Sequence, residues 1–383
     1  MTTLQLPTPE GTLEPYELGH HPVVAPVFGT PRTRAAYAAV HVVADPLGDP
    51  VGTSAIDWDA TMAFRHYLWS LGLGVAEAMD TAQRGMGLSS EDVERLIRLS
   101  IREARTVDGL VACGITTDDL GGADHSLDEI GAAYLDQLGW VEEEGGVSVI
   151  MASRALARSA SGPDDYARVY GRVISQAGSA VILHWLGPMF DPSLAGYWGS
   201  SNPETAMRSL VDIVRDNQSG VDGVKISMLD EELEVEFRRL LPEGVRCYTG
   251  DDFNFPTLIG GDHSGHSDAL LGIFDAIAPV AITALHALDD GDRSTFDRLL
   301  APTVSLSRHI FQTPTYHYKT GLVFLAYLQG HQDHFRMVGG QEGFRSVIHL
   351  AELVRLADAA GLLSEPDRVA QRLRPVLATA GLA

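Results

Sequence analysis

A regular alternation between short apolar runs and longer amphipathic segments restricts the fold of this chain most strongly. Eight runs have the length and branched apolar content of buried strands, at residues 39–44, 73–79, 110–115, 147–151, 181–184, 221–226, 245–249 and 270–274. The segments between them carry apolar residues at helical spacing, and Asp57 stands where one such helix should begin. Ser89, followed three residues later by Asp92, resembles a helix cap. This alternation predicts parallel βα units.

Eight strands with intervening helices predict an α/β fold, a (β/α)8 TIM barrel over residues 39–290. A doubly wound open sheet is the alternative, but no glycine-rich phosphate-binding turn follows the first strand. Residues 1–38 contain many prolines and glycines, and we expect them to form an irregular N-terminal arm. Residues 291–383 show helical spacing without a strand pattern, which predicts an all-helical C-terminal region.

The charge balance and the cysteine content argue against several classes of function. With 51 acidic and 28 basic residues, the formal net charge is −23, which disfavours nucleic acids and anionic membranes as partners. Cys113 and Cys247 are the only cysteines and lie in apolar runs, so we expect no disulfide framework. Neither a charged leader nor an apolar run of membrane-spanning length is visible. The pattern predicts a cytoplasmic protein without a membrane partner.

Lysine is unusually rare in this chain. Of the 28 basic residues, only Lys225 and Lys319 are lysines, so arginine supplies almost every plain positive charge. A desolvated lysine can lose its proton and attack a carbonyl carbon, which an arginine cannot do. Lys225 lies near the end of the sixth predicted strand and is therefore our candidate nucleophile. Lys319 lies in the C-terminal helical region, where we expect a structural role.

Polar residues gather at the predicted C-terminal ends of the strands, where (β/α)8 barrels carry their active sites. These candidates are Glu77, Asp80, Thr81, Arg84, Ser153, Arg154, His184, Lys225, Thr249, Asp251 and Asp252. We expect Glu77, Thr81, Arg154, His184, Lys225 and Asp251 to surround one cavity, and the other candidates to contact a small carbonyl substrate. His263 is a further candidate for substrate binding.

Residues 262–268 hold the densest cluster of possible metal ligands, with two histidines and two aspartates. A metal-dependent sugar isomerase or epimerase that uses His184, Asp251, His263 and His266 is therefore an alternative function. A non-catalytic binding barrel is a third interpretation. The chain has no Gly-x-Ser-x-Gly turn after a strand, so a serine hydrolase is not supported.

Several motifs resemble landmarks of one family. The run VDGVK at residues 221–225 is similar to the Schiff-base lysine strand of the dihydrodipicolinate synthase and N-acetylneuraminate lyase superfamily of class I aldolases. YTGDD at 248–252 and AIAP at 276–279 resemble later landmarks of this superfamily. The similarity covers roughly residues 39–330 and is greatest to a dihydrodipicolinate synthase-like branch.

The resemblance implies a function and a set of residue roles. Lys225 would form a Schiff base without any other cofactor, and a divalent metal remains the alternative. His184 stands where the family has a tyrosine and would move protons, with Thr81 orienting the exchange. Residues 80–84 replace the family's Gly-Thr-Thr-Gly-Glu loop, and Arg154 is a candidate for binding a carboxylate.

Together these features predict a carbon–carbon lyase or aldolase of carbohydrate metabolism that acts on a keto sugar or a 2-oxo acid. Because members of the family are commonly dimers or tetramers, we expect a homo-oligomer.

Overall fold

The fold is described from a computed structural model that covers residues 2–19, 25–50 and 55–382. The chain divides into two compact units. The barrel unit comprises Arg34–Val40 and Gly74–Gly272, and the helical unit comprises Met1–Thr33, His41–Leu73 and Ile273–Ala383.

Eight parallel strands form a closed barrel in the barrel unit. In the order of their pairing they are β10 (Asp268–Leu271), β3 (Ala36–Ala39), β4 (Gly74–Glu77), β5 (Val111–Ile115), β6 (Val147–Ile150), β7 (Val181–Leu186), β8 (Val221–Ser227) and β9 (Arg246–Thr249). Every neighbouring pair is parallel, as expected for strands joined by helical crossovers. The predicted (β/α)8 barrel is confirmed.

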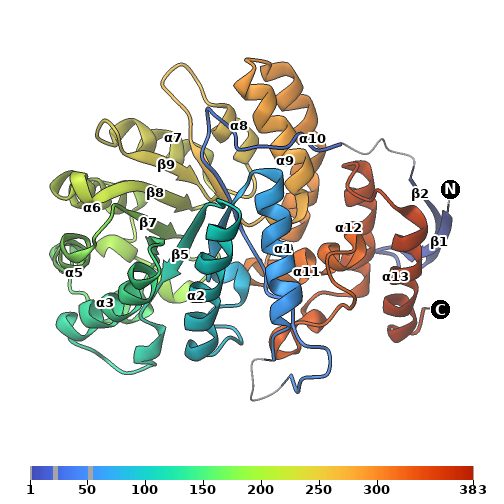
Figure 1. The fold of residues 1–383 in the computed structure, drawn as a ribbon, viewed down its shortest axis with the longest axis horizontal. Coiled ribbons are helices and arrows are strands. Elements are labelled where there is room, and N and C mark those ends of the chain that lie inside the picture. The colour runs from blue at the N-terminus through green and yellow to red at the C-terminus, as the bar shows by residue number, and fades with distance from the viewer. Residues whose placement is uncertain (1, 20–24, 51–54, 383) are drawn as a thin grey trace. The chain divides into compact units, whose positions relative to one another are not determined.

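Helices connect these strands and lie outside them (Figure 1). They are α2 (Ser90–Thr106), α3 (Leu127–Glu143), α4 (Arg154–Ser159), α5 (Pro163–Gln176), α6 (Pro203–Asp216), α7 (Glu231–Leu240) and α8 (Phe255–Gly260). Short 3-10 turns are η1 (Asp80–Ala82), η2 (Asp118–Leu120), η3 (Pro192–Leu194), η4 (Tyr197–Gly199) and η5 (Gln218–Gly220). On α2 the buried residues include Val93, Leu96, Ile97 and Ile101, a spacing that forms one apolar face.

Small and apolar side chains fill the interior of the barrel. One buried cluster takes residues from seven strands and two loops: Ala39, Ala76, Met79, Ala112, Val149, Met151, Ile182, Tyr248 and Leu270. Successive side chains of a strand point to opposite faces of the sheet. Residues two positions along a strand from these members therefore also face the interior, and immediate neighbours face the helices.

The first and last barrel strands are displaced from their predicted positions. The first occupies Ala36–Ala39 instead of 39–44, and the last occupies Asp268–Leu271 instead of 270–274. Phe274 begins the helix α9 (Phe274–Asp289). Val42 is 1% exposed although it lies beyond the strand, so an apolar run continues past the end of the hydrogen-bonded ladder. Hydrophobicity alone does not mark that end.

The helical unit contains the remaining helices and one hairpin. Its helices are α1 (Trp58–Leu71), α9, α10 (Arg293–Ile310), α11 (Tyr318–Gln329), α12 (Val347–Ala359) and α13 (Pro366–Thr379), with 3-10 segments η6 (Thr315–His317) and η7 (Val338–Phe344). Strand β1 (Thr2–Pro7) pairs antiparallel with β2 (Leu13–Leu18), beside α12 and α13 (Figure 1).

Residues 1–38 were predicted to form an irregular arm. This prediction is wrong, because the segment contains the hairpin and most of β3. Both hairpin strands are short, and β2 has mostly polar or exposed residues, so neither gives a strong strand pattern. Residues 20–24 of the arm lie outside the described residues. Within the described ranges, every helix is too short or too polar to span a membrane.

The hydrogen bond of Ser89, which caps the N-terminus of α2, can be tested by substitution. Ser89 Oγ accepts a hydrogen bond from the backbone N–H of Asp92 at 3.1 Å. Ser89→Ala should lower the free energy of unfolding by about 1 kcal/mol, because a donor of the first helical turn loses its partner. Urea unfolding measures this change. Ser175→Ala removes an exposed hydroxyl within α5 and is the control, and equal effects of both variants would contradict the cap.

Candidate functional site

Two inward-facing residues, Lys225 and His184, form the centre of the candidate site. They are direct register partners on β8 and β7, so their side chains point to the same face of the sheet. Ile182, two residues before His184, belongs to the interior cluster, which places both side chains inside the barrel. Lys225 is 7% exposed and His184 is 0% exposed. The structure thus brings together Lys225 and His184, two of the three residues predicted to be catalytic, of which Thr81 is the third.

Ser227 adds a hydroxyl to this pair. Its Oγ lies 3.0 Å from His184 Nε2. A Cβ atom placed on Gly250 would lie 2.2 Å from Ser227 Oγ and 2.7 Å from Lys225 Cε, so both side chains lie against this glycine. Ser227 was missing from the predicted set. Strand alternation could have found it, because it lies two residues after Lys225 and shares its face.

Burial and charge set the protonation of this group. Burial lowers the pKa of the Lys225 amine below its ordinary value, because the ammonium ion loses hydration, while the charges of Asp252 and Asp80 oppose this shift. Burial and the positive charge of Lys225 hold the pKa of His184 well below its ordinary value. The imidazole is therefore neutral at pH 7. Its Nδ1 atom has no hydrogen-bond partner among the described residues.

Glu77, which was predicted to line the cavity, and Thr249, which was predicted to contact substrate, both point away from the barrel interior. Glu77 accepts a hydrogen bond from Ser100 Oγ on α2 at 2.6 Å, and Thr249 Oγ1 donates to Glu234 on α7 at 3.0 Å. Each is adjacent in sequence to a member of the interior cluster and so faces the helices. Neither belongs to the group around Lys225.

Arg84 uses its guanidinium inside the protein. Nη1 donates to the backbone oxygen of Gly114 at 2.9 Å, and Nη2 donates to Thr116 Oγ1 at 3.0 Å and to Gln137 Oε1. Nε also donates to Thr116, at 3.2 Å. These contacts join the loop after β4 to β5. Substrate binding by Arg84 stays a prediction, and its contacts give it a structural role.

Arg154 lies between two carboxylates. Its Nε donates to Asp191 at 2.5 Å and its Nη1 donates to Asp118 at 3.1 Å. A Cβ atom on Gly85, which has φ +68°, would lie 3.1 Å from Nη1, so this glycine makes room for the guanidinium. The side chain is 39% exposed. Arg154 is therefore accessible, but the acids beside it offset its charge.

Three further candidates, Ser153, Asp251 and Thr81, are buried, and the first two make hydrogen bonds that hold loops. Ser153 Oγ caps α4 through the N–H of Leu156 at 2.9 Å and lies 2.5 Å from Thr117 Oγ1. Asp251 Oδ1 accepts from the N–H of Phe253 at 2.8 Å, which holds the turn after β9. Burial raises the pKa of Asp251. Thr81 is 2% exposed in η1.

His263 and His266 do not join the other candidates. They lie in the loop that leads from α8 into the start of β10, whereas Lys225 lies near the C-terminal end of β8. In a parallel barrel these two ends are opposite. The predicted four-residue metal site with His184 and Asp251 is therefore wrong as a single cluster. No group of three or more possible metal ligands occurs in the described part of the chain.

Glu234 is a buried carboxyl that the sequence did not indicate. It is 0% exposed on α7 and accepts from Ser267 Oγ at 2.7 Å and Thr249 Oγ1 at 3.0 Å. The N–H of Asp251 donates in turn to Thr249 Oγ1 at 3.1 Å. Burial raises the pKa of Glu234 to about 8, so it is largely neutral at pH 7. Several glutamates occur in α7, and the sequence distinguishes Glu234 from the others only by its position next to the apolar Leu233, which is buried.

Glu234 should make stability fall as the pH rises. Its pKa is about 8 in the folded protein and about 4.5 when unfolded, so between these values only the folded state keeps the proton. Glu234→Gln removes this dependence. The difference between the free energies of unfolding of the variant and the wild type should therefore grow between pH 5 and pH 8, by about 1 kcal/mol per pH unit in favour of the variant. Urea unfolding at several pH values measures the difference, with the exposed Glu232→Gln as control; parallel curves would contradict the assignment.

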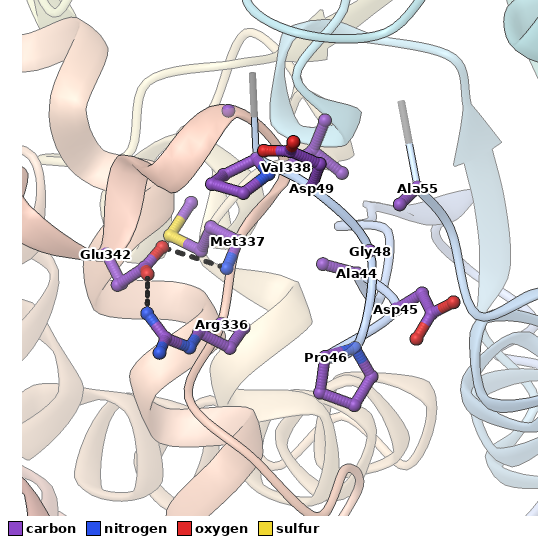
Figure 2. A pocket seen from close by; sticks show the side chains of 12 residues that line it. Ala44, Asp45, Pro46, Gly48, Asp49, Ala55, Arg336, Met337, Val338 and Glu342 are labelled. Atoms are coloured by element: carbon purple, nitrogen blue, oxygen red, sulfur yellow. Dashed lines mark hydrogen bonds and ion pairs between the residues drawn. The ribbon is translucent and has the colours of Figure 1, made fainter. Parts of the chain in front are cut away.

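A separate cavity of about 140 Å³ lies within the helical unit (Figure 2). It lies between the segment after β3 and the segment that leads into η7. Glu342 and Arg336 lie next to each other on one side of it. Glu342 accepts from Arg336 Nη1 at 2.8 Å and from the N–H of Met337 at 3.1 Å. None of the predicted site residues lines this cavity.

Comparisons with known proteins place the fold. A family model described as "Protein of unknown function (DUF993)" matches residues 4–382. The fold is that of the dihydrodipicolinate synthase family. No curated protein matches the chain by sequence.

Three solved structures illustrate the likeness. YagE, a prophage protein of the dihydrodipicolinic acid synthase family from E. coli K12 in complex with pyruvate, is 14% identical, with 91% of this chain and 99% of that chain covered and a TM-score of 0.62. A dihydrodipicolinate synthase from Bacillus anthracis is 15% identical, with coverages of 85% and 99% and a TM-score of 0.61. A monomeric dihydrodipicolinate synthase variant is 13% identical, with coverages of 86% and 98% and a TM-score of 0.63.

Proposed function

The chain belongs to the DUF993 family, and we propose that it is an aldolase or lyase that forms a Schiff base between Lys225 and a carbonyl substrate. One observation carries this proposal. Lys225 is a buried lysine inside a (β/α)8 barrel, near the C-terminal end of its strand, and burial lowers the pKa of its amine. This end of the barrel is where enzymes of this fold react with their substrates.

The amine must be unprotonated to attack a carbonyl. Its pKa must therefore lie below the ordinary value of a lysine, which is about 10.4. Burial inside the barrel acts in this direction, because the ammonium ion loses hydration there. Asp252 and Asp80 limit this shift, because their negative charges favour the ammonium form.

The proposed reaction follows from this nucleophile. The Lys225 nitrogen bonds to the carbonyl carbon, and one water leaves to give a protonated imine. In the cleavage direction, the bond between the carbons α and β to the imine breaks, and its electron pair moves toward the iminium nitrogen. The hydroxyl on the β carbon loses its proton, and an aldehyde leaves. The enamine then takes up a proton, and one water hydrolyses the imine and restores the amine.

His184 and Ser227 are the groups that we propose for proton transfer. The neutral imidazole can accept a proton, and its Nε2 atom lies 3.0 Å from the Ser227 hydroxyl. Both side chains face the same interior as Lys225. Thr81, Ser153, Arg154, Asp80 and Asp252 remain proposed substrate contacts, with Thr81 orienting the exchange.

Lys225→Arg tests the proposal. The variant keeps a positive charge but cannot form an imine, so cleavage and synthesis should fall at least a thousandfold. After borohydride reduction with hydroxyacetone, dihydroxyacetone or pyruvate, mass spectrometry should find an adduct on Lys225 in the wild type and none in this variant. Lys319→Arg changes the only other lysine and is the matched control, because it should trap substrate like wild type. An adduct on Lys319, or full activity of Lys225→Arg, would contradict the proposal.

Asp252→Asn tests the electrostatic part of the account. Removal of a negative charge beside Lys225 makes the ammonium ion less favourable, so the pKa of the amine falls further. The rate of imine trapping with cyanoborohydride should then reach half its maximum about 1 pH unit lower than in wild type. Asp212→Asn, on the exposed face of α6, should leave the profile in place. If the pH of half-maximal trapping rose in Asp252→Asn, the proposed effect of the Asp252 charge on Lys225 would be contradicted.

The metal-dependent isomerase has no specific observation in its favour, because its predicted ligands do not meet. Assembly as a dimer or tetramer and a cytoplasmic location stay predictions.

A further inference from the structure

We infer that the Lys225 site selects an uncharged α-hydroxy ketone or α-hydroxy aldehyde over a 2-oxo acid. This inference rests on the proposed Schiff base at Lys225 and names the class of substrate that the site would take.

The first observation is the Nδ1 atom of His184, which has no hydrogen-bond partner among the residues that the structure describes. The residue is 0% exposed, faces the barrel interior beside Lys225, and uses Nε2 on Ser227. A buried polar atom without a partner is costly, so a bound ligand that supplies one gains affinity. In the neutral ring, Nδ1 either carries a hydrogen or offers a lone pair. A hydroxyl group can match either state, whereas a carboxylate can only accept.

The second observation is that Arg84 and Arg154, the two arginines among the predicted site residues, already bond to other groups of the protein. The Arg84 guanidinium donates to Thr116, to Gln137 and to the backbone of Gly114. Arg154 is held by Asp191 and Asp118. A 2-oxo acid needs a donor group for its carboxylate, and these two guanidiniums already satisfy carboxylates and carbonyls of the protein.

The third observation concerns the loop after β4. The N–H of Ala82 donates to Met79 O at 3.1 Å, and the N–H of Gln83 donates to Asp80 O at 2.9 Å. These amides close a 3-10 turn that begins with an acidic residue, Asp80. Backbone amides that already bond within their own turn are not donors for an anion. The loop therefore brings a negative charge toward Lys225.

The charges near the amine point in the same direction. Asp252 and Asp80 both act electrostatically on Lys225. A substrate carboxylate on the carbon next to the imine would lie close to these acids and be repelled, because like charges in a partly buried site are weakly screened. A hydroxyl on that carbon carries no charge and can donate to a carboxylate. The acids and the histidine thus favour one substrate chemistry.

The reaction balances for this substrate class. The Lys225 amine and the hydroxy ketone lose one water to form the imine, and loss of a proton from the hydroxyl-bearing carbon gives the enamine. The enamine carbon bonds to the carbonyl carbon of an aldehyde, whose oxygen takes up a proton. One water then hydrolyses the imine. Cleavage is the reverse sequence.

Parallel trapping experiments test this inference. Wild-type protein is incubated with equal concentrations of dihydroxyacetone, hydroxyacetone, acetone or pyruvate, reduced with borohydride and examined by mass spectrometry. We expect Lys225 adducts of the two hydroxy ketones to form at least about tenfold faster than the pyruvate adduct, as one repelled charge would produce. Hydroxyacetone should also react faster than acetone, from which it differs by one hydroxyl.

Two variants identify the residues responsible. His184→Phe keeps a buried ring without Nδ1 and should reduce the ratio of hydroxyacetone to acetone trapping toward one. Asp80→Asn should raise pyruvate trapping relative to dihydroxyacetone. Thermal unfolding checks that each variant is folded.

The outcomes distinguish a failure of the proposed substrate class from a failure of the proposed Schiff base at Lys225. A pyruvate adduct on Lys225 that forms as fast as the hydroxy ketone adducts would overturn the substrate class and leave the Schiff base intact. Absence of any Lys225 adduct with all four compounds would overturn the Schiff base, and the substrate class with it.

Discussion

Side-chain alternation in a closed parallel barrel is the constraint on which the site depends. A strand in this barrel has one face toward a small interior and one toward the helices, so a shift of one residue exchanges the two environments. His184, Lys225 and Ser227 share the interior face. Glu77 and Thr249, at similar strand ends, face the helices and bond to them. The same rule that fills the core therefore decides which polar residues can meet a substrate.

The proposed chemistry needs two opposing electrostatic effects in one place. Burial favours the free amine of Lys225, whereas Asp252 and Asp80 favour the ammonium ion. The acids also serve a purpose in the proposed substrate class, since they repel a carboxylate and accept hydroxyl hydrogens. Behind this layer, Glu234 joins α7 to β9 through Thr249, which in turn holds the loop that carries Asp252. The position of the charges that act on Lys225 thus rests on buried hydrogen bonds.

Much of this arrangement was accessible from the sequence. The barrel followed from eight apolar runs, and Lys225 with His184 followed from lysine rarity and strand ends. The ends of the first and last strands did not follow, because apolar residues such as Val42 continue past the ladder. The contacts of Arg84 and the position of His263 did not follow from the sequence, for different reasons. Arg84 makes contacts that join segments distant in the sequence. His263 lies just before the start of β10, and the direction of this strand places it at the end of the barrel opposite to Lys225.

Direct titration of Lys225 tests the central claim, that burial lowers the pKa of its amine despite the nearby acids. The chain has two lysines, so protein labelled with ¹³C at lysine Cε gives two NMR signals, and Lys319→Arg leaves only that of Lys225. We expect this signal to titrate with a midpoint below the ordinary value of a lysine, which is about 10.4, because burial disfavours the ammonium ion. A midpoint at or above the ordinary value would show that the acids prevail over burial, and would contradict the account.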